Sequence, residues 1–425
     1  MATNEEHTHA RFGVRAERVV VHGPIPPTGF YIHGAGPVLW TEYVNGGTVP
    51  TGADFVRAVK QLAERAGVDT TPLERTQPPD RRTDLLHTFF EHCRRELAGD
   101  RGAKARAYLE RRGFPHDSIL HTGLGIVPTA RSTHHLLEHA GYSKAEIEAS
   151  GILADSRWPG RLCGAWRDAN GRIGTLWTRT LDSTDDAAKR YLYLRGASRT
   201  NLPPYGLSDL LTNGPAPREI VLVEGLIDVH QLRARGIENV AALGGTSIRP
   251  QTFERLQRRG IETITLVLDN DDAGRAAAAR AVEQSVRAKD SPRLCVVDPQ
   301  HLAPRNDPDE LVRTKGTAAW HDLLALQACG VEWRAHEFLG GVTRESPTHE
   351  RRAALARSGQ WLGTLPPRLA LEQEDAVLGV AGRSGYSPEA VGRAFRARFW
   401  RESPRHVERA PGMDHVAGRT LTRSD

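Results

Sequence analysis

The sequence predicts a multidomain protein of mixed α/β and α+β architecture, with one parallel β-sheet at its centre. At 425 residues the chain is too long for a single hydrophobic core and suggests two to four domains. From Arg218 onward, short apolar runs alternate with amphipathic helical patterns, which is typical of parallel strands joined by right-handed helical crossovers. The expected strands are 219–223, 239–243, 263–268 and 293–298, and the expected helices are 226–235, 250–259 and 272–288.

A linker, a helix and a β-hairpin are expected upstream of this sheet. Residues 69–83 are rich in proline, threonine and charge, as linkers are. Thr83 or Asp84 can cap the helix that follows, which is expected to run to about Leu97. Two strand-like runs on either side of an Asp-Ala-Asn-Gly turn predict a β-hairpin over 161–179. Two further helices are expected over 103–112 and 134–139.

The pattern changes again towards the C-terminus. Beyond Thr317 it is helical throughout, and apolar residues such as Leu371 and Phe395 are expected to face a helical core. The tail after Arg401 shows no periodicity and is expected to be mobile. The expected segments are an N-terminal domain over 1–68, a linker and helix over 69–99, a basic mixed α/β subdomain over 100–213, the parallel-sheet domain over 214–316, a helical C-terminal subdomain over 317–402 and the tail over 403–425.

The charge of the chain comes mainly from arginine. The formal net charge is +5 and the pI about 9.1, and only six of the 57 basic residues are lysine. Arginine suits bidentate contacts to phosphate, which favours nucleic-acid binding, but a GC-rich genome also enriches arginine. Both explanations of the arginine content stay open at this point.

Cysteine spacing and hydropathy exclude several classes of protein. The four cysteines, Cys93, Cys163, Cys295 and Cys329, form no Cys-x-x-Cys motif, which argues against a zinc ribbon and against a disulfide framework. No run of 18 apolar residues occurs, and the first residues are acidic and polar. We therefore expect a cytoplasmic protein without a membrane span or secretion signal.

Carboxylates gather where the expected strands end. Glu224 follows the first strand, and Asp269 and Asp271 follow the third. Because the carboxyl ends of parallel strands share one edge of the sheet, these acids are expected to lie together and to repel one another by roughly 4 kcal/mol per pair. A hard cation would relieve this repulsion, and oxygen ligands without clustered histidine or cysteine suit Mg²⁺ or Mn²⁺. Asp228 and the acidic step of Asp307 and Asp309 complete the set.

Four motifs in this region occur in the order and spacing of a known family. They are Val-Glu224-Gly-Leu-Ile-Asp228-Val, Leu-Gly-Gly245-Thr246-Ser247, Leu-Asp269-Asn-Asp271-Asp-Ala-Gly274-Arg275 and Asn-Asp307-Pro-Asp309-Glu-Leu. Together they resemble the Toprim domain of bacterial DnaG-type primases. The upstream segments 105–113, 124–128 and 160–179 are similar to the first part of the primase catalytic core. The resemblance covers roughly residues 100 to 315.

The resemblance implies synthesis of short RNA primers on single-stranded DNA from ribonucleoside triphosphates. It makes Asp269, Asp271 and Asp309 the expected metal ligands, with Asp228 and Asp307 in support. Glu224 is the expected general base, or the group that positions a metal-bound atom. Catalysis would thus rest on Glu224, Asp269 and Asp271.

The same resemblance assigns residues to phosphate and template binding. Gly245, Thr246 and Ser247 precede an expected helix and could offer backbone amides to a phosphate, with Arg275 nearby. Basic residues of the hairpin region would grip the template backbone with little dependence on base sequence. The expected template contacts are Arg161, Arg172, Arg179, Arg190 and Tyr191.

The chain departs from the family pattern in several places. Residues 29–67 look like the end of the primase zinc ribbon and the helix after it, but Ile32 and Ala35 occupy two positions of zinc-binding cysteines. Neither side chain can ligate Zn²⁺, so no zinc is expected. Asn270 replaces a glycine and Arg190 replaces a lysine of the family.

Two alternative functions remain open, as does the role of three tryptophans. The same carboxylates could cleave phosphodiesters, as in a Toprim-type nuclease. Alternatively, the missing cysteines suggest a catalytically reduced relative that acts as a DNA-binding accessory protein. Trp158, Trp166 and Trp177 could stack on bases or pack in the core. No P-loop motif occurs, so a separate replicative helicase is the expected partner.

Overall fold

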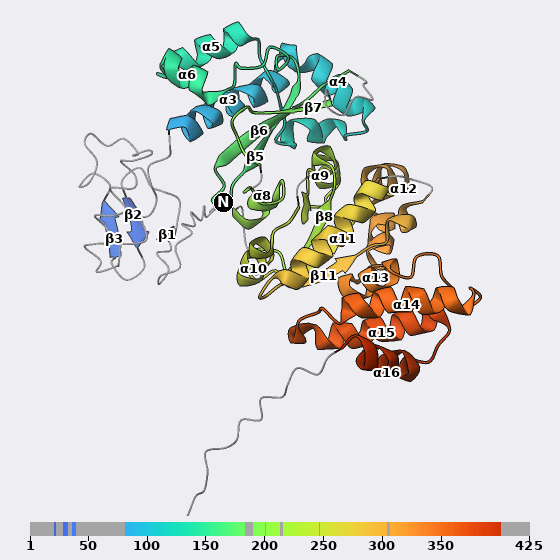
Figure 1. Ribbon diagram of the computed structural model, residues 1–425. Helices are drawn as coiled ribbons and strands as arrows, with labels where there is room; N and C mark the ends of the chain where they lie inside the picture. Colours follow the sequence, from blue (N-terminus) through green and yellow to red (C-terminus); the bar gives the residue numbers. More distant parts are fainter. Residues whose placement is uncertain are drawn as a thin grey trace, which may run out of the picture. The chain divides into compact units, whose positions relative to one another are not determined.

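The chain divides into two units, and Figure 1 shows its helices and strands coloured along the sequence. The computed structural model describes residues 81–182, 190–199, 201–212, 216–245, 247–303 and 307–400, and the backbone of three strands nearer the N-terminus. The first unit comprises Met1–Cys93 and Pro128–Pro159, and the second comprises Arg94–Val127 and Gly160–Asp425. The segment boundaries expected from the sequence stay predictions.

The first unit contains a small antiparallel sheet and several helices. The sheet has the order β1 (Val21–His22), β2 (Gly29–Ile32) and β3 (Gly36–Leu39), with Ile32 at the end of β2. Ala35 lies outside the described residues. The helices are α5 (Ala130–His139), α6 (Lys144–Ser150) and the beginning of α3 (Arg81–Ala98). Thr83 and Asp84 lie inside α3, so their expected role as its cap was wrong: the helical pattern extends at least to Arg81.

The first sheet of the second unit has four antiparallel strands. It follows η2 (Asp100–Gly102), α4 (Ala103–Arg111) and η3 (His116–His121). Its strand order is β4 (Gly125–Ile126), β5 (Leu162–Arg167), β6 (Ile173–Arg179) and β7 (Tyr191–Tyr193). Strands β5 and β6 pair antiparallel along most of their length, which confirms the hairpin expected over 161–179.

The two tryptophans of this hairpin lie in a hydrophobic core. Trp166 and Trp177 are fully buried, and Trp158 in the first unit is 2% exposed, so all three pack in the interior rather than offering a surface for base stacking. Gly164 lies directly opposite Trp177 in the strand register. A Cβ atom at Gly164 would approach the indole ring to 2.3 Å, so the ring occupies the space that a side chain at this position would need.

The parallel sheet expected from the sequence forms the rest of the second unit. Its order is β12-β11-β10-β8-β9, with β8 (Glu219–Val223), β9 (Val240–Ala242), β10 (Thr263–Leu266) and β11 (Arg293–Val296) parallel. The helices α8 (Leu207–Thr212), α9 (Leu226–Arg233), α10 (Pro250–Arg258) and α11 (Asp272–Arg287) connect or flank these strands. Every expected strand and helix of this region is therefore confirmed, within one to two residues at each end.

The C-terminal part is mainly helical, but it also supplies a strand. After η4 (Pro299–Leu302), α12 (Pro308–Leu324) kinks at Gly316, whose φ of 81° is left-handed. Strand β12 (Ala328–Cys329) then pairs antiparallel with β11 at the sheet edge, so the prediction of helix throughout was wrong there. The remaining elements are α13 (Gly330–Glu337), α14 (Thr348–Leu362), η5 (Pro367–Leu369), α15 (Ala370–Ser384) and α16 (Pro388–Arg398).

Burial in these helices follows the sequence pattern with one exception. Phe395 is 2% exposed and packs with Val331, Ala354 and Val380 in a separate apolar cluster. Leu371 is 76% exposed, so its expected place on the buried face was wrong. None of the helices among the described residues is both long enough and apolar enough to span a bilayer.

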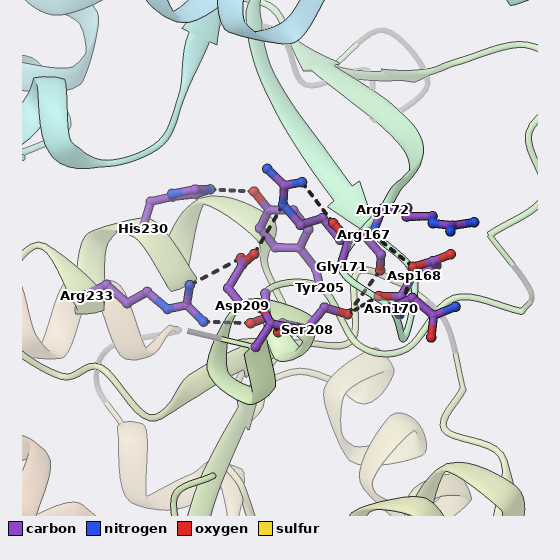
Figure 2. Close-up of polar contacts among 12 residues, drawn as sticks. Arg167, Asp168, Asn170, Gly171, Arg172, Tyr205, Ser208, Asp209, His230 and Arg233 are labelled. Carbon is purple, nitrogen blue, oxygen red and sulfur yellow. Dashed lines mark hydrogen bonds and ion pairs between the residues drawn. The ribbon is translucent and has the colours of Figure 1, made fainter. Parts of the chain in front are cut away.

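A buried polar network joins the hairpin region to the parallel sheet, as Figure 2 shows. The Nδ1 atom of His230 lies 2.7 Å from the carbonyl oxygen of Thr122, which can only accept, so Nδ1 carries the proton. Nε2 therefore accepts from the Tyr205 hydroxyl at 2.6 Å. Burial, followed by the charge of Arg233, lowers the pKa of His230 to about 3, so the ring is neutral at physiological pH. The Asp209 carboxylate lies between Arg167 and Arg233 in the same network.

Replacing Tyr205 by Phe is expected to lower the free energy of unfolding by about 1 to 3 kcal/mol. The change leaves the buried Nε2 of His230 without a donor, and a buried unpaired acceptor carries a penalty of this size. Urea unfolding measures the difference. Tyr142→Phe is the matched control, because its hydroxyl makes only a 3.3 Å contact with Thr88 and should cost less than about 0.5 kcal/mol. Equal stability of Tyr205→Phe and the parent would contradict the network.

Candidate active site

Two adjacent strands bring Glu224 and Asp269 to the same edge of the parallel sheet. Strands β8 and β10 are parallel neighbours in register, with Leu222 opposite Leu266. Glu224 follows β8 directly, and Asp269 follows β10 after two buried residues. The backbone amide of Asp269 lies near the Glu224 carboxylate and lowers its pKa, against the effect of burial. The two acids therefore follow neighbouring parallel strands at the same edge of the sheet, and their role as metal ligands stays a prediction.

One oxygen of each of these carboxylates is buried without a partner. Oε2 of Glu224 and Oδ1 of Asp269 are inaccessible to solvent, and neither has a hydrogen-bond partner. Burial, followed by the charges of Asp228 and Glu224, raises the pKa of Asp269 to about 8. Burial, followed by the charge of Asp271, also raises the pKa of Glu224. Buried acceptors of like charge are the chemistry that a divalent cation satisfies.

Asp271 is held in place at the start of α11. It is the N-cap residue of this helix, and its Oδ1 accepts a 2.7 Å hydrogen bond from the backbone amide of Gly274. A Cβ atom at position 274 would come within 2.3 Å of the carbonyl oxygen of Asp269. Glycine at 274 therefore lets the first turn of α11 lie directly against the backbone of Asp269.

A second acidic group forms where α9 and α12 meet. Burial, followed by the charges of Asp309 and Asp307, raises the pKa of Asp228 to about 7. Asp309 is 6% exposed, and burial, followed by the charge of Asp307, raises its pKa as well. The Asp228 carboxylate folds back against Gly225, where a Cβ atom would meet its Oδ2 at 2.3 Å. Asp307 is the N-cap residue of α12 and accepts from the amide of Glu310 at 2.7 Å.

Basic side chains flank this second group. The Arg112 guanidinium lies 3.9 Å from Asp309, and the charges of Arg235 and Arg313 also lower the pKa of Asp309. Arg112 and Arg179 oppose the raised pKa of Asp228 in the same way. None of the site residues predicted from the sequence is Arg112, Arg235 or Arg313. Arg112 lies at the end of the Tyr108-to-Gly113 motif, but spacing along the chain gives no sign of its contact with α12.

The six predicted carboxylates do not form one coordination shell. Across the described residues, no three His, Cys, Asp or Glu side chains lie close enough to hold a single metal ion. Asp271 and Asp307 each use one oxygen to cap a helix, and Asp309 lies 3.9 Å from the Arg112 guanidinium. The unpaired oxygens of Glu224 and Asp269 are the atoms that best fit a cation.

The expected phosphate-binding residues lie at the next strand end. Gly245 is exposed with a left-handed φ of 74°, and Ser247 is exposed shortly before α10 begins at Pro250. Thr246 lies outside the described residues. Arg275 is bonded to Glu337 at 2.8 Å and lies 3.6 Å from Asp298. Its guanidinium is thus neutralised by two acids, and a phosphate would have to compete with them.

The expected template contacts are partly engaged inside the protein. Arg161 donates to the Thr178 hydroxyl at 3.0 Å and to the Arg190 carbonyl at 2.7 Å. Arg179 donates to the hydroxyl of Tyr108 at 2.8 Å and to that of Tyr191 at 2.5 Å. These bonds join the β5–β6 hairpin to β7 and to α4. Arg172 and Arg190 are half-buried, and the template role of all five residues stays a prediction.

Comparison with known proteins agrees with this geometry. Residues 221–312 match the family described as Toprim-like. A DNA primase of Pseudomonas aeruginosa is 31% identical over 300 residues, which are 65% of this chain and 44% of that protein. The chain therefore spans less than half the length of this relative.

Solved structures share the fold. The RNA polymerase domain of Mycobacterium tuberculosis primase DnaG, in complex with a double-stranded DNA oligomer that carries a 6-nucleotide overhang, superposes with a TM-score of 0.58 at 23% identity. That match covers 72% of this chain and 98% of the other. The Aquifex aeolicus primase structure, with zinc-binding and RNA polymerase domains, gives a TM-score of 0.59 at 17% identity and covers 92% and 93% of the two chains. Residues 221–312 of the chain thus match a Toprim-like domain, and the chain is similar in sequence to bacterial DNA primases.

Proposed function

We propose that this protein synthesises short RNA primers on single-stranded DNA by metal-dependent nucleotidyl transfer. The observation that carries the proposal is the pair of buried, unpaired oxygens, Glu224 Oε2 and Asp269 Oδ1, at the carboxyl edge of the Toprim-like sheet. Ligands of open α/β sheets bind at this edge. The sequence similarity to DNA primases supports nucleotidyl transfer as the class of reaction.

The residues of this edge have distinct roles in the proposal. Glu224 and Asp269 hold the cation, and Asp271 lies within electrostatic range of both. Mg²⁺ or Mn²⁺ bound there would lower the pKa of the attacking 3′-hydroxyl and neutralise charge on the phosphate. Asp228, Asp307 and Asp309 add negative charge next to the pair.

The same proposal covers the partners. The template is single-stranded DNA, and the substrates are ribonucleoside triphosphates. The Mycobacterium tuberculosis primase domain was solved with a double-stranded DNA oligomer that carries a 6-nucleotide overhang, which supports a DNA template. We include a cytoplasmic location and a separate replicative helicase. The helicase is proposed because the 425 residues contain no P-loop motif.

One assay separates priming from its alternatives. The full chain is incubated with circular single-stranded DNA and Mn²⁺ or Mg²⁺, with and without labelled ribonucleoside triphosphates. Short RNA that appears only with nucleotides and metal is the expected result. DNA cleavage without nucleotides would instead identify a Toprim-type nuclease. DNA binding without any product, under either metal, would identify an accessory protein and overturn the proposal.

A further inference from the structure

Two cysteines face each other across the edge of the parallel sheet. Cys295 of β11 and Cys329 of β12 are direct partners in the antiparallel register. Directly opposed residues of an antiparallel pair point to the same face, with Cβ atoms about 4.5 to 5.5 Å apart. A disulfide needs a Cβ separation of about 3.5 to 4.5 Å. A backbone movement of about 1 Å would therefore bring the two Cβ atoms within the range of a disulfide.

The two thiols differ in access. Cys295 is 2% exposed, whereas Cys329 is half-buried, and both are free. Cys329 is also the N-cap residue of α13, and the amides of Val331 and Glu332 favour its thiolate. Burial raises the pKa of both thiols and is the larger influence on each. An external reagent therefore reaches Cys329 first. The reaction is slow because the raised pKa keeps most of this thiol protonated.

The junction between β12 and α13 is packed tightly against β11. A Cβ atom at Gly330 would lie 3.0 Å from the carbonyl oxygen of Leu294. Glycine at this position lets the chain turn from β12 into α13 while it touches the neighbouring strand. The pairing of β12 with β11 and this close approach of the backbones place Cys329 beside Cys295 in the reduced state.

We propose that Cys295 and Cys329 form a redox-active thiol pair, which oxidises to an intramolecular disulfide and ties β12 and α13 to the parallel sheet. The proposal does not depend on the nucleotidyl transfer proposed above. The closed loop runs from 295 to 329 and contains all of α12 with Asp307 and Asp309. Oxidation would restrict the unfolding of this helix, because a covalent loop limits the unfolded chain.

The chemistry balances with a small-molecule disulfide such as oxidised glutathione. The Cys329 thiolate attacks one glutathione sulfur, which forms a mixed disulfide and releases one glutathione thiolate. The Cys295 thiolate then attacks Sγ of Cys329 and releases the second glutathione thiolate. The two released thiolates take up the two protons that the cysteines lost. The net result is one protein disulfide and two molecules of reduced glutathione.

Peptide mapping of the full chain tests the proposal. The protein is incubated with oxidised glutathione, alkylated under denaturing conditions, digested and analysed without reduction. The expected product is a cross-linked pair of peptides containing Cys295 and Cys329, with a mass loss of two hydrogen atoms. Cys93 and Cys163, which are fully buried and in other elements, should be recovered as alkylated thiols. The oxidised protein should unfold at a higher temperature than the reduced protein.

Serine variants make the order of attack visible. Cys295→Ser removes the resolving thiol, so a lasting glutathione adduct on Cys329 is expected. Cys329→Ser removes the accessible thiol, so Cys295 should stay unmodified in the folded protein. Cys163→Ser is the matched control and should still form the cross-link. A lasting glutathione adduct or unreacted Cys295 and Cys329 in the parent protein, or a cross-link to Cys93 or Cys163, would overturn the proposal.

Discussion

Replacing Asp269 by Asn is expected to lower primer synthesis by at least about 100-fold. The change keeps the size of the side chain but removes the charge that, with Glu224, would bind the divalent cation. Electrostatic stabilisation at the reacting phosphate is usually the largest single contribution to such reactions. Incorporation of labelled ribonucleotides on single-stranded DNA, at saturating Mn²⁺, measures the loss.

The same variant is expected to be more stable than the parent in the absence of metal. The pKa of Asp269 is raised to about 8 in the folded protein, above its ordinary value near 4. Ionisation therefore destabilises the folded state, and the penalty grows as the pH rises from about 4 to 8. The asparagine of the variant carries no charge. At pH 8 its free energy of unfolding should therefore exceed that of the parent by on the order of 1 to 3 kcal/mol, and this difference should vanish below about pH 4. Thermal unfolding in EDTA measures it.

Asp290→Asn is the matched control for both measurements. Asp290 is exposed and precedes β11, so it lies at the amino end of the strands, away from the carboxyl edge that holds Asp269. Its replacement should leave synthesis unchanged and alter stability by less than about 0.5 kcal/mol. An Asp269→Asn protein with nearly normal synthesis would show that this carboxylate does not bind the catalytic cation. Lost synthesis together with lost stability would indicate misfolding instead.

Replacing Gly274 by Ala is expected to disrupt the site through the backbone. The new Cβ atom would lie 2.3 Å from the carbonyl oxygen of Asp269, a contact that neither segment can accept without moving. The first turn of α11 would move away from the strand end and would take the Asp271 cap with it. Synthesis should fall by at least about tenfold, since small displacements of catalytic groups carry large kinetic penalties. The overpacking should also cost about 1 to 3 kcal/mol of stability, measured by urea unfolding.

Gly382→Ala provides a matched helical control. Gly382 lies in α15, and no atom would come within 4 Å of a Cβ placed there. Because alanine restricts the unfolded chain more than glycine does, the free energy of unfolding of this variant should be up to about 1 kcal/mol higher than that of the parent. Synthesis by Gly382→Ala should match that of the parent. If Gly274→Ala behaved in the same way as Gly382→Ala, α11 would not depend on close contact with Asp269.

The sequence predicted the parallel sheet well, because each strand and helix carries its own apolar pattern. Glu224 and Asp269 could be placed for the same reason: both follow strands whose ends share one edge. Strand β12 could not be predicted, since two residues between helices show no periodicity and depend entirely on β11 for pairing. Leu371 lies within a helical pattern, but its side chain is largely open to solvent in α15.

Contacts between distant side chains limited the prediction of the site. Nothing in the pattern around Arg179 shows that two tyrosine hydroxyls occupy its guanidinium, one of them from α4. His230 is one residue of an apolar helix, and its bonds to Tyr205 and Thr122 join segments 25 and 108 residues away. The ion pair between Arg112 and Asp309 likewise joins residues that lie far apart in the chain. The spacing of residues along the chain does not reveal such contacts.

The contact between Gly164 and Trp177 constrains how the hairpin can change during evolution. With the indole in place, any larger residue at 164 would collide with it, whereas a smaller residue at 177 would leave a void above the glycine. Substitution must therefore begin at 177, and an intermediate sequence must tolerate that void before 164 can grow. Relatives that have lost this tryptophan are the ones in which a side chain at 164 should be found.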